Sequence, residues 1–447
     1  MNISVYYSNG KVNYNKGSEM KKPPLGIAFL QGQENLIDGD DLKENLDKIR
    51  QKIADLSNVK NVHFLLGAGA SSGAIPTMKE MVASIDSRLL LPPPPPPTFP
   101  TIPPPIPSST ILPTPFVATT HLQALFNKIK CSTKDNLEDI LGVLYSRRAY
   151  LEGSGDKLSG DYYETLPLIK IIESEMFKQI NIDFNTGKSQ ETLALYNDFY
   201  QKITLRNKDL SRVNVFTTNN DLFNEKALDY SNINYNNGFG GGLDRVFNPA
   251  RFNYTFSRKI DAEVQKYEPL DNMVYLYKLH GSISWRESKN NSFFQIQEVA
   301  TKHDEDVPND NILIYPTPLK QNKSLGSPYS DLIREFQKKL LQPHSVIFVI
   351  GYSFSDEHLN NIIYQALASN SSISVVVFGD YGDKEIFKVN DRRIYKIFGN
   401  VANDKIHYFK YIVDNFLPDL EEFEDINLLK KFMNNLADEK NKAKGSK

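Results

Sequence analysis

The sequence predicts an α/β fold, a doubly wound parallel sheet with an inserted helical subdomain. Short apolar runs of strand length, among them residues 61–66, 213–216 and 345–350, each end in a segment rich in Gly, Ser, Thr or Asn. Between these runs, apolar residues recur three and four positions apart, which is the spacing of an amphipathic helix. Strands that alternate with helices favour parallel pairing through crossover helices, so the sheet is expected to be Rossmann-like.

The N-terminal part of the chain is predicted to contain an arm, a helix and the first strand of the sheet. Residues 1–35 are expected to be extended or irregular and to form an arm that packs on a partner. Leucines and isoleucines three and four apart predict a helix over residues 40–56. The strand at 61–66 leads into a glycine-rich turn. Pro76 is predicted to open the next helix, which ends near Leu90, because proline loses no hydrogen bond in a first turn.

A proline-rich segment follows this helix. Pro92–Pro97 form an unbroken run, and seven more prolines follow up to Pro115. Such a run excludes helix and strand and predicts polyproline II or a loop. It is either a docking motif or stiff flap near a site, or a tolerated surface insertion. Residues 121–206, with apolar positions at helical spacing, are predicted to form the inserted helical subdomain.

The remaining elements follow from the same two patterns. They comprise strands at 213–216, 273–279, 311–315, 345–350 and 373–378, helices at 330–341, 356–367 and 417–436, and a flexible loop at 236–242. The predicted organisation is an N-terminal arm and helix (1–58), a Rossmann-like domain (59–91 and 207–380), a proline-rich loop (92–118), a helical insertion (119–206) and a C-terminal mostly helical region (381–447).

Composition excludes several classes of function. The net charge is −2, and no Lys/Arg run stands out before the tail after Lys440, so neither sequence-specific nucleic-acid binding nor membrane attachment is expected. The sequence shows no 18-residue apolar stretch and no signal peptide, which predicts a cytoplasmic protein. Cys131 is the single cysteine, so an internal disulfide and a multi-cysteine zinc site are excluded. The seven histidines show no ligand-like spacing, so no metal is expected.

The first candidate site segment is the loop Gly67-Ala68-Gly69-Ala70-Ser71 at the end of strand 61–66. Glycines let a backbone approach a phosphate closely and present its N–H groups, and the Ser71 hydroxyl adds a donor. An ordinary tight turn uses the same residues. The nucleotide-binding hypothesis names Gly67, Ala68, Gly69 and Ser71 as contacts.

The second segment is Thr217-Thr218-Asn219-Asn220-Asp221, after strand 213–216. A neutral amide such as Asn219 can orient a nucleophile beside a developing positive charge. A buried carboxylate such as Asp221 can stabilise that charge and fix the amide. Thr218 is predicted to contact the nucleotide. The alternative is a capping cluster, in which Asn220 or Asp221 caps the next helix.

The third segment is His280-Gly281, after strand 273–279. Imidazole can accept a proton near neutral pH, and the carboxyl edge of a parallel sheet is where ligands bind in open α/β folds. Gly281 lets the chain turn away and leaves room for a sugar. The alternative is a histidine that only satisfies local hydrogen bonds.

The fourth segment is Gly351-Tyr352-Ser353, after strand 345–350. Gly351 and Ser353 are predicted to contact the nucleotide, and Asp356 either caps its helix or faces the ribose. Asp380, beyond strand 373–378, stands where an acidic residue often binds adenosine hydroxyls.

In this order the four segments resemble the sirtuin family of NAD-consuming, Rossmann-like enzymes, over roughly residues 60–380. Sirtuins carry Thr-Gln-Asn-x-Asp at the second segment, where Asn219 and Asp221 stand in register and Thr218 replaces Gln. After the glycine loop they carry Ile-Pro-Asp-Phe-Arg, where this chain has Ile75-Pro76-Thr77-Met78-Lys79. The stretch Gly-Tyr-Ser-Phe-Ser-Asp-x-His is similar to the bacterial sirtuin-like branch rather than to the deacylases. The cysteine pairs of the deacylase zinc module are absent from the sequence.

The resemblance implies an NAD glycohydrolase that releases nicotinamide and ADP-ribose, with NAD as substrate and no zinc. Asn219, His280 and Asp221 would be the catalytic residues. It further implies an NAD-depleting role in bacterial anti-phage defence, a homo-oligomer and a HerA-like hexameric ATPase as partner. The alternatives are a scaffold subunit that binds NAD or ADP-ribose, and an NAD-dependent protein deacylase or ADP-ribosyltransferase.

Overall fold

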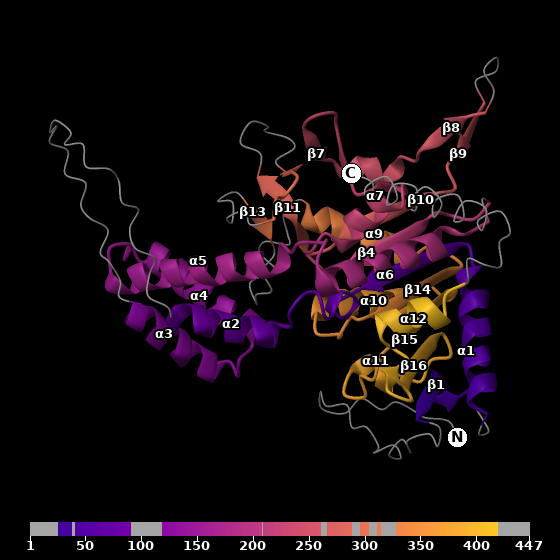
Figure 1. Cartoon of the computed structure of the whole chain (residues 1–447), viewed down its shortest axis with the longest axis horizontal. Coiled ribbons are helices and arrows are strands. Elements are labelled where there is room, and N and C mark those ends of the chain that lie inside the picture. The colour runs from indigo at the N-terminus through magenta and orange to yellow at the C-terminus, as the bar shows by residue number, and fades with distance from the viewer. Residues whose placement is uncertain are drawn as a thin grey trace, which may run out of the picture.

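The computed structural model describes residues 26–37, 41–90, 119–207, 209–260, 266–287, 296–303, 311–313 and 328–418. The proline-rich segment 92–118 lies wholly outside these ranges. So does the helix predicted at 417–436, except for its first two residues. Figure 1 shows a body built on one large sheet, with a group of helices beside it.

The large sheet has the order β2-β1-β16-β15-β14-β3-β4-β10-β5. From β16 to β5 every neighbouring pair is parallel, whereas β1 closes the edge antiparallel to β16. The strands are β1 Ile27–Gln31, β2 Glu34–Asn35, β3 Asn61–Leu66, β4 Val213–Thr217, β5 Asn234–Asn236, β10 Met273–Lys278, β14 Ser345–Ile350, β15 Ile373–Phe378 and β16 Ile394–Val401, with β17 Asp404–Lys405 paired to β16.

Helices cover both faces of this sheet, because successive strand side chains point to opposite sides. In β3, Phe64 and Leu66 belong to one buried cluster and Leu65 to the other. The first face packs α1 Leu42–Ser57, α6 Gly187–Thr204, α7 Phe223–Tyr230 and α12 Phe409–Asn415. The second packs α9 Tyr329–Leu340, α10 Glu357–Ser369 and α11 Glu385–Lys388. The predicted doubly wound α/β fold is confirmed.

The helices between β3 and β4 form a core of their own. They are α2 Met78–Leu90, α3 Thr119–Ser132, α4 Leu137–Gly153 and α5 Gly160–Ile180. Figure 1 shows this group to the left of the sheet. The next helix, α6, packs instead on the sheet through Tyr196, Phe199 and Tyr200. The division of the chain into domains stays a prediction.

A smaller antiparallel sheet lies beyond the end of β10. Its order is β13-β11-β12-β7-β6, and its strands are β6 Phe239–Gly240, β7 Arg245–Phe247, β11 Gly281–Glu287, β12 Ile296–Glu298 and β13 Asn311–Leu313. A separate hairpin of β8 Ser257–Lys259 and β9 Tyr267–Pro269 projects from the body (Figure 1). The short helices η1 Ala68–Ser71 and η2 Pro249–Asn253 complete the described elements.

Four sequence-based expectations need correction. Residues 27–31 are not part of an irregular arm but the edge strand β1, and its partner β16 lies in the region expected to be mostly helical. Phe239 in the expected flexible loop is buried and pairs within the small sheet. Pro76 does not open α2, which begins at Met78. Thr77 and Glu80 instead cap that helix reciprocally: the Thr77 N–H donates to Glu80 and the Glu80 N–H to the Thr77 hydroxyl.

Register in the sheet positions the candidate site. Leu66 pairs with Ile350 on one side and with Thr217 on the other, and Thr217 pairs with Lys278. Four neighbouring strands, β14, β3, β4 and β10, therefore end in one row. The four segments singled out in the sequence all begin at this row or within two residues after it.

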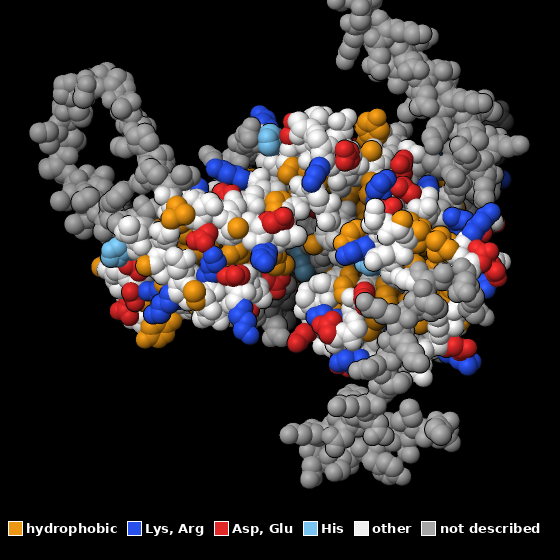
Figure 2. Space-filling view, turned by 60° about the horizontal axis from the view of Figure 1, so that its bottom comes forward, with side chains coloured by type: hydrophobic (Ala, Val, Ile, Leu, Met, Phe, Trp, Pro, Cys, Tyr) orange, Lys and Arg blue, Asp and Glu red, His pale blue; other side chains and the backbone are white. Residues whose placement is uncertain are grey.

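The surface and the described helices give two further observations. Acidic and basic side chains are interspersed over the face shown in Figure 2. None of the helices in the described ranges combines the length and the apolar character needed to cross a membrane.

Candidate active site

A cavity of about 360 Å³ opens at the carboxyl ends of β14, β3, β4 and β10. Its volume falls in the range of small-molecule sites, roughly 300–1,000 Å³. Residues of all four segments line it, together with side chains from α2, α4 and α5. From the segments these are Ala68, Gly69, Ser71, Thr218, Asn219, Asn220, Asp221, His280, Gly351, Tyr352 and Ser353, and Ser72, Ser355 and Asp356 follow shortly after two of the segments.

Glycines in two of the loops allow those loops to touch. The N–H groups of Gly67 and Gly69 donate to the carbonyls of Ile350 and Gly351, each at 2.9 Å. A Cβ on Gly67 would lie 2.5 Å from the Gly351 oxygen. Gly351 has φ +64°, and a Cβ there would lie 2.6 Å from the Ala70 nitrogen.

The expectation for the glycine loop therefore needs correction. The two glycine N–H groups bond to protein rather than standing free for phosphate, because the loop of β14 packs against the loop of β3. Gly67 is not among the cavity-lining residues, whereas Ala68 and Gly69 are.

Ser71 is the centre of a buried hydrogen-bond network. Its hydroxyl donates to Asp221 Oδ2 at 2.8 Å and accepts from Asn219 Nδ2 at 3.1 Å. The Tyr196 hydroxyl lies 3.0 Å from the same oxygen. A serine hydroxyl has one proton to donate and two lone pairs, so these three contacts use it completely. Ser71 thus fixes Asn219 rather than offering a free donor to a phosphate, which corrects the sequence-based expectation.

One N–H of the Asn219 amide is bound to Ser71, which leaves the carbonyl oxygen of this cavity-lining residue as an acceptor. Asn219 is only 7% exposed, and its backbone N–H donates to the Thr217 hydroxyl. Tyr196 comes from α6 and stacks on Phe223 with ring centroids 5.4 Å apart. Sequence reasoning missed this tyrosine, since nothing in helical spacing separates it from a core residue.

Asp221 lines the cavity and is almost completely buried. Its Oδ1 accepts from the Phe223 N–H at 3.1 Å, at the start of α7, although the N-cap residue of that helix is Leu222. Burial raises the pKa of this carboxyl, while the Lys278 charge acts in the opposite direction. Asp221 thus satisfies one N–H at the start of α7 and also binds Ser71, while its catalytic role stays a prediction.

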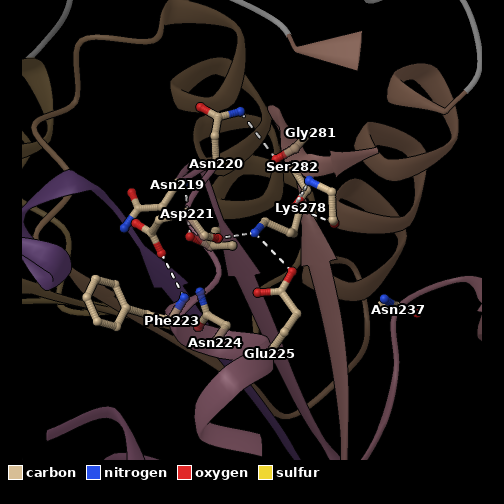
Figure 3. Close-up of polar contacts among 12 residues, drawn as sticks. Asn219, Asn220, Asp221, Phe223, Asn224, Glu225, Asn237, Lys278, Gly281 and Ser282 are labelled. Atoms are coloured by element: carbon tan, nitrogen blue, oxygen red, sulfur yellow. Dashed lines mark hydrogen bonds and ion pairs between the residues drawn. The ribbon is translucent and has the colours of Figure 1, made fainter. Parts of the chain in front are cut away.

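Lys278 is a buried cation behind the site (Figure 3). It forms an ion pair with Glu225 at 2.9 Å and donates to the backbone carbonyl of Asp221. Burial raises the pKa of Glu225, against the effect of the lysine. Neither residue was predicted, although a lysine within the apolar run of β10 was a usable signal.

His280 is held from two directions. Asn220 Nδ2 donates to the His280 carbonyl at 2.7 Å, and Gly281, with φ +84° in the left-handed region, turns the chain into β11. The ring Nε2 lies 3.1 Å from Asp356 Oδ2. The second carboxylate oxygen, Oδ1, accepts from the N–H groups of His358 and Leu359 and caps α10. Asp356 thus caps its helix and reaches the cavity at once.

The helical group supplies the opposite wall of the cavity. This wall is largely apolar and carries one carboxylate; its residues are Ile75, Pro76, Met78, Met81, Met176, Ile180 and Glu138. Flexible methionine side chains adapt to the shape of a ligand, and apolar walls suit flat aromatic rings. Sequence reasoning missed this wall because its members come from separate helices.

Two residues predicted to contact the nucleotide do not lie among the buried site residues. Asp380 is exposed after β15 and does not line the cavity. Ser353 lines the cavity at its exposed rim, and its hydroxyl lies 2.9 Å from that of Ser355. Among the described residues, no group of three or more His, Cys, Asp and Glu is placed to hold a metal ion.

Comparison with known families matches part of this chain. Residues 213–385 match the family model of the SIR2-like domain, a range that includes Asn219, His280 and Gly351. The glycine loop precedes the match. A comparison with curated proteins found no significant match. A SIR2-like domain points to NAD-dependent activity in general and agrees with the Rossmann-like sheet. Over residues 213–385 the chain is thus similar to the SIR2-like domain.

Proposed function

We propose that this protein is an NAD glycohydrolase that cleaves NAD to nicotinamide and ADP-ribose. The observation that carries the proposal is the convergence of Asn219 and His280 on one cavity at the carboxyl edge of the sheet. The apolar wall of that cavity suits a flat ring, and its opposite side offers hydroxyls, an amide and an imidazole to a sugar.

In the proposed reaction, the bond between the nicotinamide nitrogen and the ribose carbon breaks, and its electron pair leaves with nicotinamide. The ring thereby loses its positive charge, and the charge develops on the ribose carbon. A water oxygen forms the new bond to that carbon and gives up one proton. The products are nicotinamide, ADP-ribose and a proton.

Each residue has a role in this step. The Asn219 carbonyl oxygen, fixed by Ser71, accepts from the attacking water and orients it. His280 accepts the proton, a contribution of about 10²- to 10⁴-fold in rate for a positioned base. The buried Asp221 carboxylate stabilises the developing positive charge through the Ser71 network.

The wider role is proposed from the sequence resemblance. We expect NAD depletion as an effector step in bacterial anti-phage defence, by a cytoplasmic homo-oligomer that works with a HerA-like ATPase. No observation on the described residues bears on these partners, so the resemblance alone supports them.

The test is incubation of the purified protein with NAD, with and without a HerA-like ATPase, followed by chromatography. Free nicotinamide and ADP-ribose in equal amounts are expected. Asn219→Ala and His280→Ala should abolish turnover while the protein stays folded. His121→Ala, on the exposed side of α3, is the matched control and should keep full activity.

Two outcomes would overturn the proposal. Intact NAD under every condition, with a folded protein, would favour a binding scaffold. NAD consumption that requires an added protein acceptor would favour a deacylase or an ADP-ribosyltransferase.

A further inference from the structure

Asp356 and His280 form a hydrogen-bonded pair across the cavity floor. The pair joins two segments that are 76 residues apart in the chain, with Asp356 Oδ2 3.1 Å from His280 Nε2. Both side chains are mostly buried, at 13% and 17% exposure, so water screens their interaction little. The contact is thus strong enough to influence which ring nitrogen carries the proton.

The carboxylate is fixed independently of the histidine. Its Oδ1 accepts from the N–H groups of His358 at 3.0 Å and Leu359 at 3.2 Å at the start of α10. The Tyr352 hydroxyl donates to the Asp356 carbonyl at 3.1 Å. A helix N-terminus favours an anion, so Oδ2 is presented to the imidazole as an ionised acceptor.

The backbone of His280 is anchored from the other side. Asn220 Nδ2 donates to the His280 carbonyl at 2.7 Å, while the ring itself contacts Asp356. The further charged groups that line the same cavity are Asp221 and Glu138, both carboxylates. Nδ1 has no hydrogen-bond partner among the described residues and belongs to a cavity-lining side chain.

We propose that Asp356 is a positioning residue that holds His280 in the tautomer protonated at Nε2, so that Nδ1 is the atom that accepts the substrate proton. The tautomer follows from the contact alone, because an ionised carboxylate can only accept and Nε2 must therefore donate. Its catalytic consequence rests on the proposed function.

Asp356→Asn separates this role from helix capping. Asn caps a helix as well as Asp, so the amide oxygen keeps the N–H bonds of α10. The amide nitrogen then takes the place of Oδ2 and donates to Nε2. That contact requires an unprotonated Nε2 and moves the ring proton to Nδ1, which can no longer act as a base.

Nitrogen NMR of histidine-labelled protein tests the tautomer without any assay of activity. Spectra are recorded at about pH 8, above the ordinary imidazole range, and the His280 signals are identified by their loss in His280→Gln. We expect an Nε2–H form in the wild type and an Nδ1–H form in Asp356→Asn. An Nδ1–H wild type, or the same tautomer in both proteins, would overturn the proposal.

Kinetics then test the consequence. Asp356→Asn should lower kcat for NAD cleavage by at least ~10²-fold with little change in KM. The matched control is Asp41→Asn, since Asp41 caps α1 in the same way, accepting from Lys43 at 2.9 Å and Glu44 at 3.2 Å. That control should keep wild-type kcat. An Asp356→Asn protein as active as Asp41→Asn would overturn the positioning role. If neither the wild type nor any variant cleaves NAD, the NMR result alone decides the proposal.

Discussion

The amide nitrogen of Asn219 lies 3.1 Å from the hydroxyl oxygen of Ser71, a residue that precedes it by 148 positions. This bond ties the loop after β4 to the loop after β3. It explains why a short 3₁₀ helix with a buried serine stands beneath a cavity edge. The orientation of the candidate catalytic amide thus depends on a residue that sequence comparison alone would assign to phosphate binding.

Replacement of this hydroxyl tests that dependence. Ser71→Ala should lower kcat for NAD cleavage roughly 10²-fold, because Asn219 is freed from its productive orientation. It should also cost about 1–3 kcal/mol in the free energy of unfolding, since the buried Asp221 loses a donor. Turnover and urea denaturation measure the two effects. Ser87→Ala, on the exposed part of α2, is the control and should change neither. Full activity in Ser71→Ala would contradict the orienting role.

The contact between the two glycine loops predicts severe effects of small substitutions. Gly67→Ala and Gly351→Ala should each destabilise the fold by about 1–3 kcal/mol or more, because the new methyl group meets backbone at 2.5–2.6 Å. Thermal unfolding would measure the loss. Gly153→Ala is the matched control, as its Cβ would meet nothing within 4 Å at the end of α4. It should be neutral or stabilise the protein by up to about 1 kcal/mol. Equal unfolding temperatures for all three variants would refute the close packing.

The buried ion pair behind the site predicts a recoverable loss of stability. Lys278→Met should cost about 3–5 kcal/mol, because the Glu225 carboxylate stays buried without its counter-ion. The double variant Lys278→Met/Glu225→Gln should recover a large part of that loss. Chemical denaturation of the single and double variants measures their free energies of unfolding and tests this recovery. The exposed pair of Lys48 and Glu44 on α1 is the control, since Lys48→Met should change stability by less than about 1 kcal/mol.

A fully buried histidine predicts a pH dependence of stability. Burial, aided by the Lys339 charge, lowers the pKa of His63 from 6.5 to about 3. Below pH 6.5 the unfolded chain therefore binds a proton at this ring, whereas the folded protein keeps the ring neutral. The free energy of unfolding is unaffected by this histidine above pH 6.5 and falls progressively as the pH is lowered toward 3. Between pH 8 and pH 5 the wild type should lose about 2 kcal/mol more than His63→Leu. Urea unfolding at the two pH values measures the difference, with exposed His121→Leu as control. An equal loss of unfolding free energy between pH 8 and pH 5 in the wild type and in His63→Leu would exclude this role of His63.

The central part of the fold could be predicted because its signals are local. The strands at 61–66, 345–350 and 373–378 are apolar runs closed by turn residues, and the structure has them at those bounds. Strand β16 could not be found in this way. It carries Lys396, which is fully buried and donates to the carbonyls of Gly32 and Phe387, both at 2.8 Å. Burial lowers the pKa of this lysine to about 8, and a lysine within a strand ordinarily indicates an exposed position.

The candidate site, too, could be predicted from the sequence only in part. Strand-end segments indicated Asn219, Asp221 and His280, because the carboxyl edge of a parallel sheet is fixed by topology. The use of the Ser71 hydroxyl, the second role of Asp356 and the methionine wall depend on which side chains meet in space. These contacts join residues from different segments, so the spacing of residues within one segment cannot predict them.

The placement of the helical group between β3 and β4 has a consequence for folding kinetics. These two strands are neighbours in the sheet, yet the chain leaves after Leu66 and returns only at Val213. Closing so long an excursion is entropically cheap at equilibrium, since each doubling of its length adds only about 0.6 kcal/mol. Contacts of high sequence separation nevertheless form slowly. The middle of the sheet should therefore be completed late, after the intervening helices have collapsed, and the cavity at its edge would be among the last features to mature.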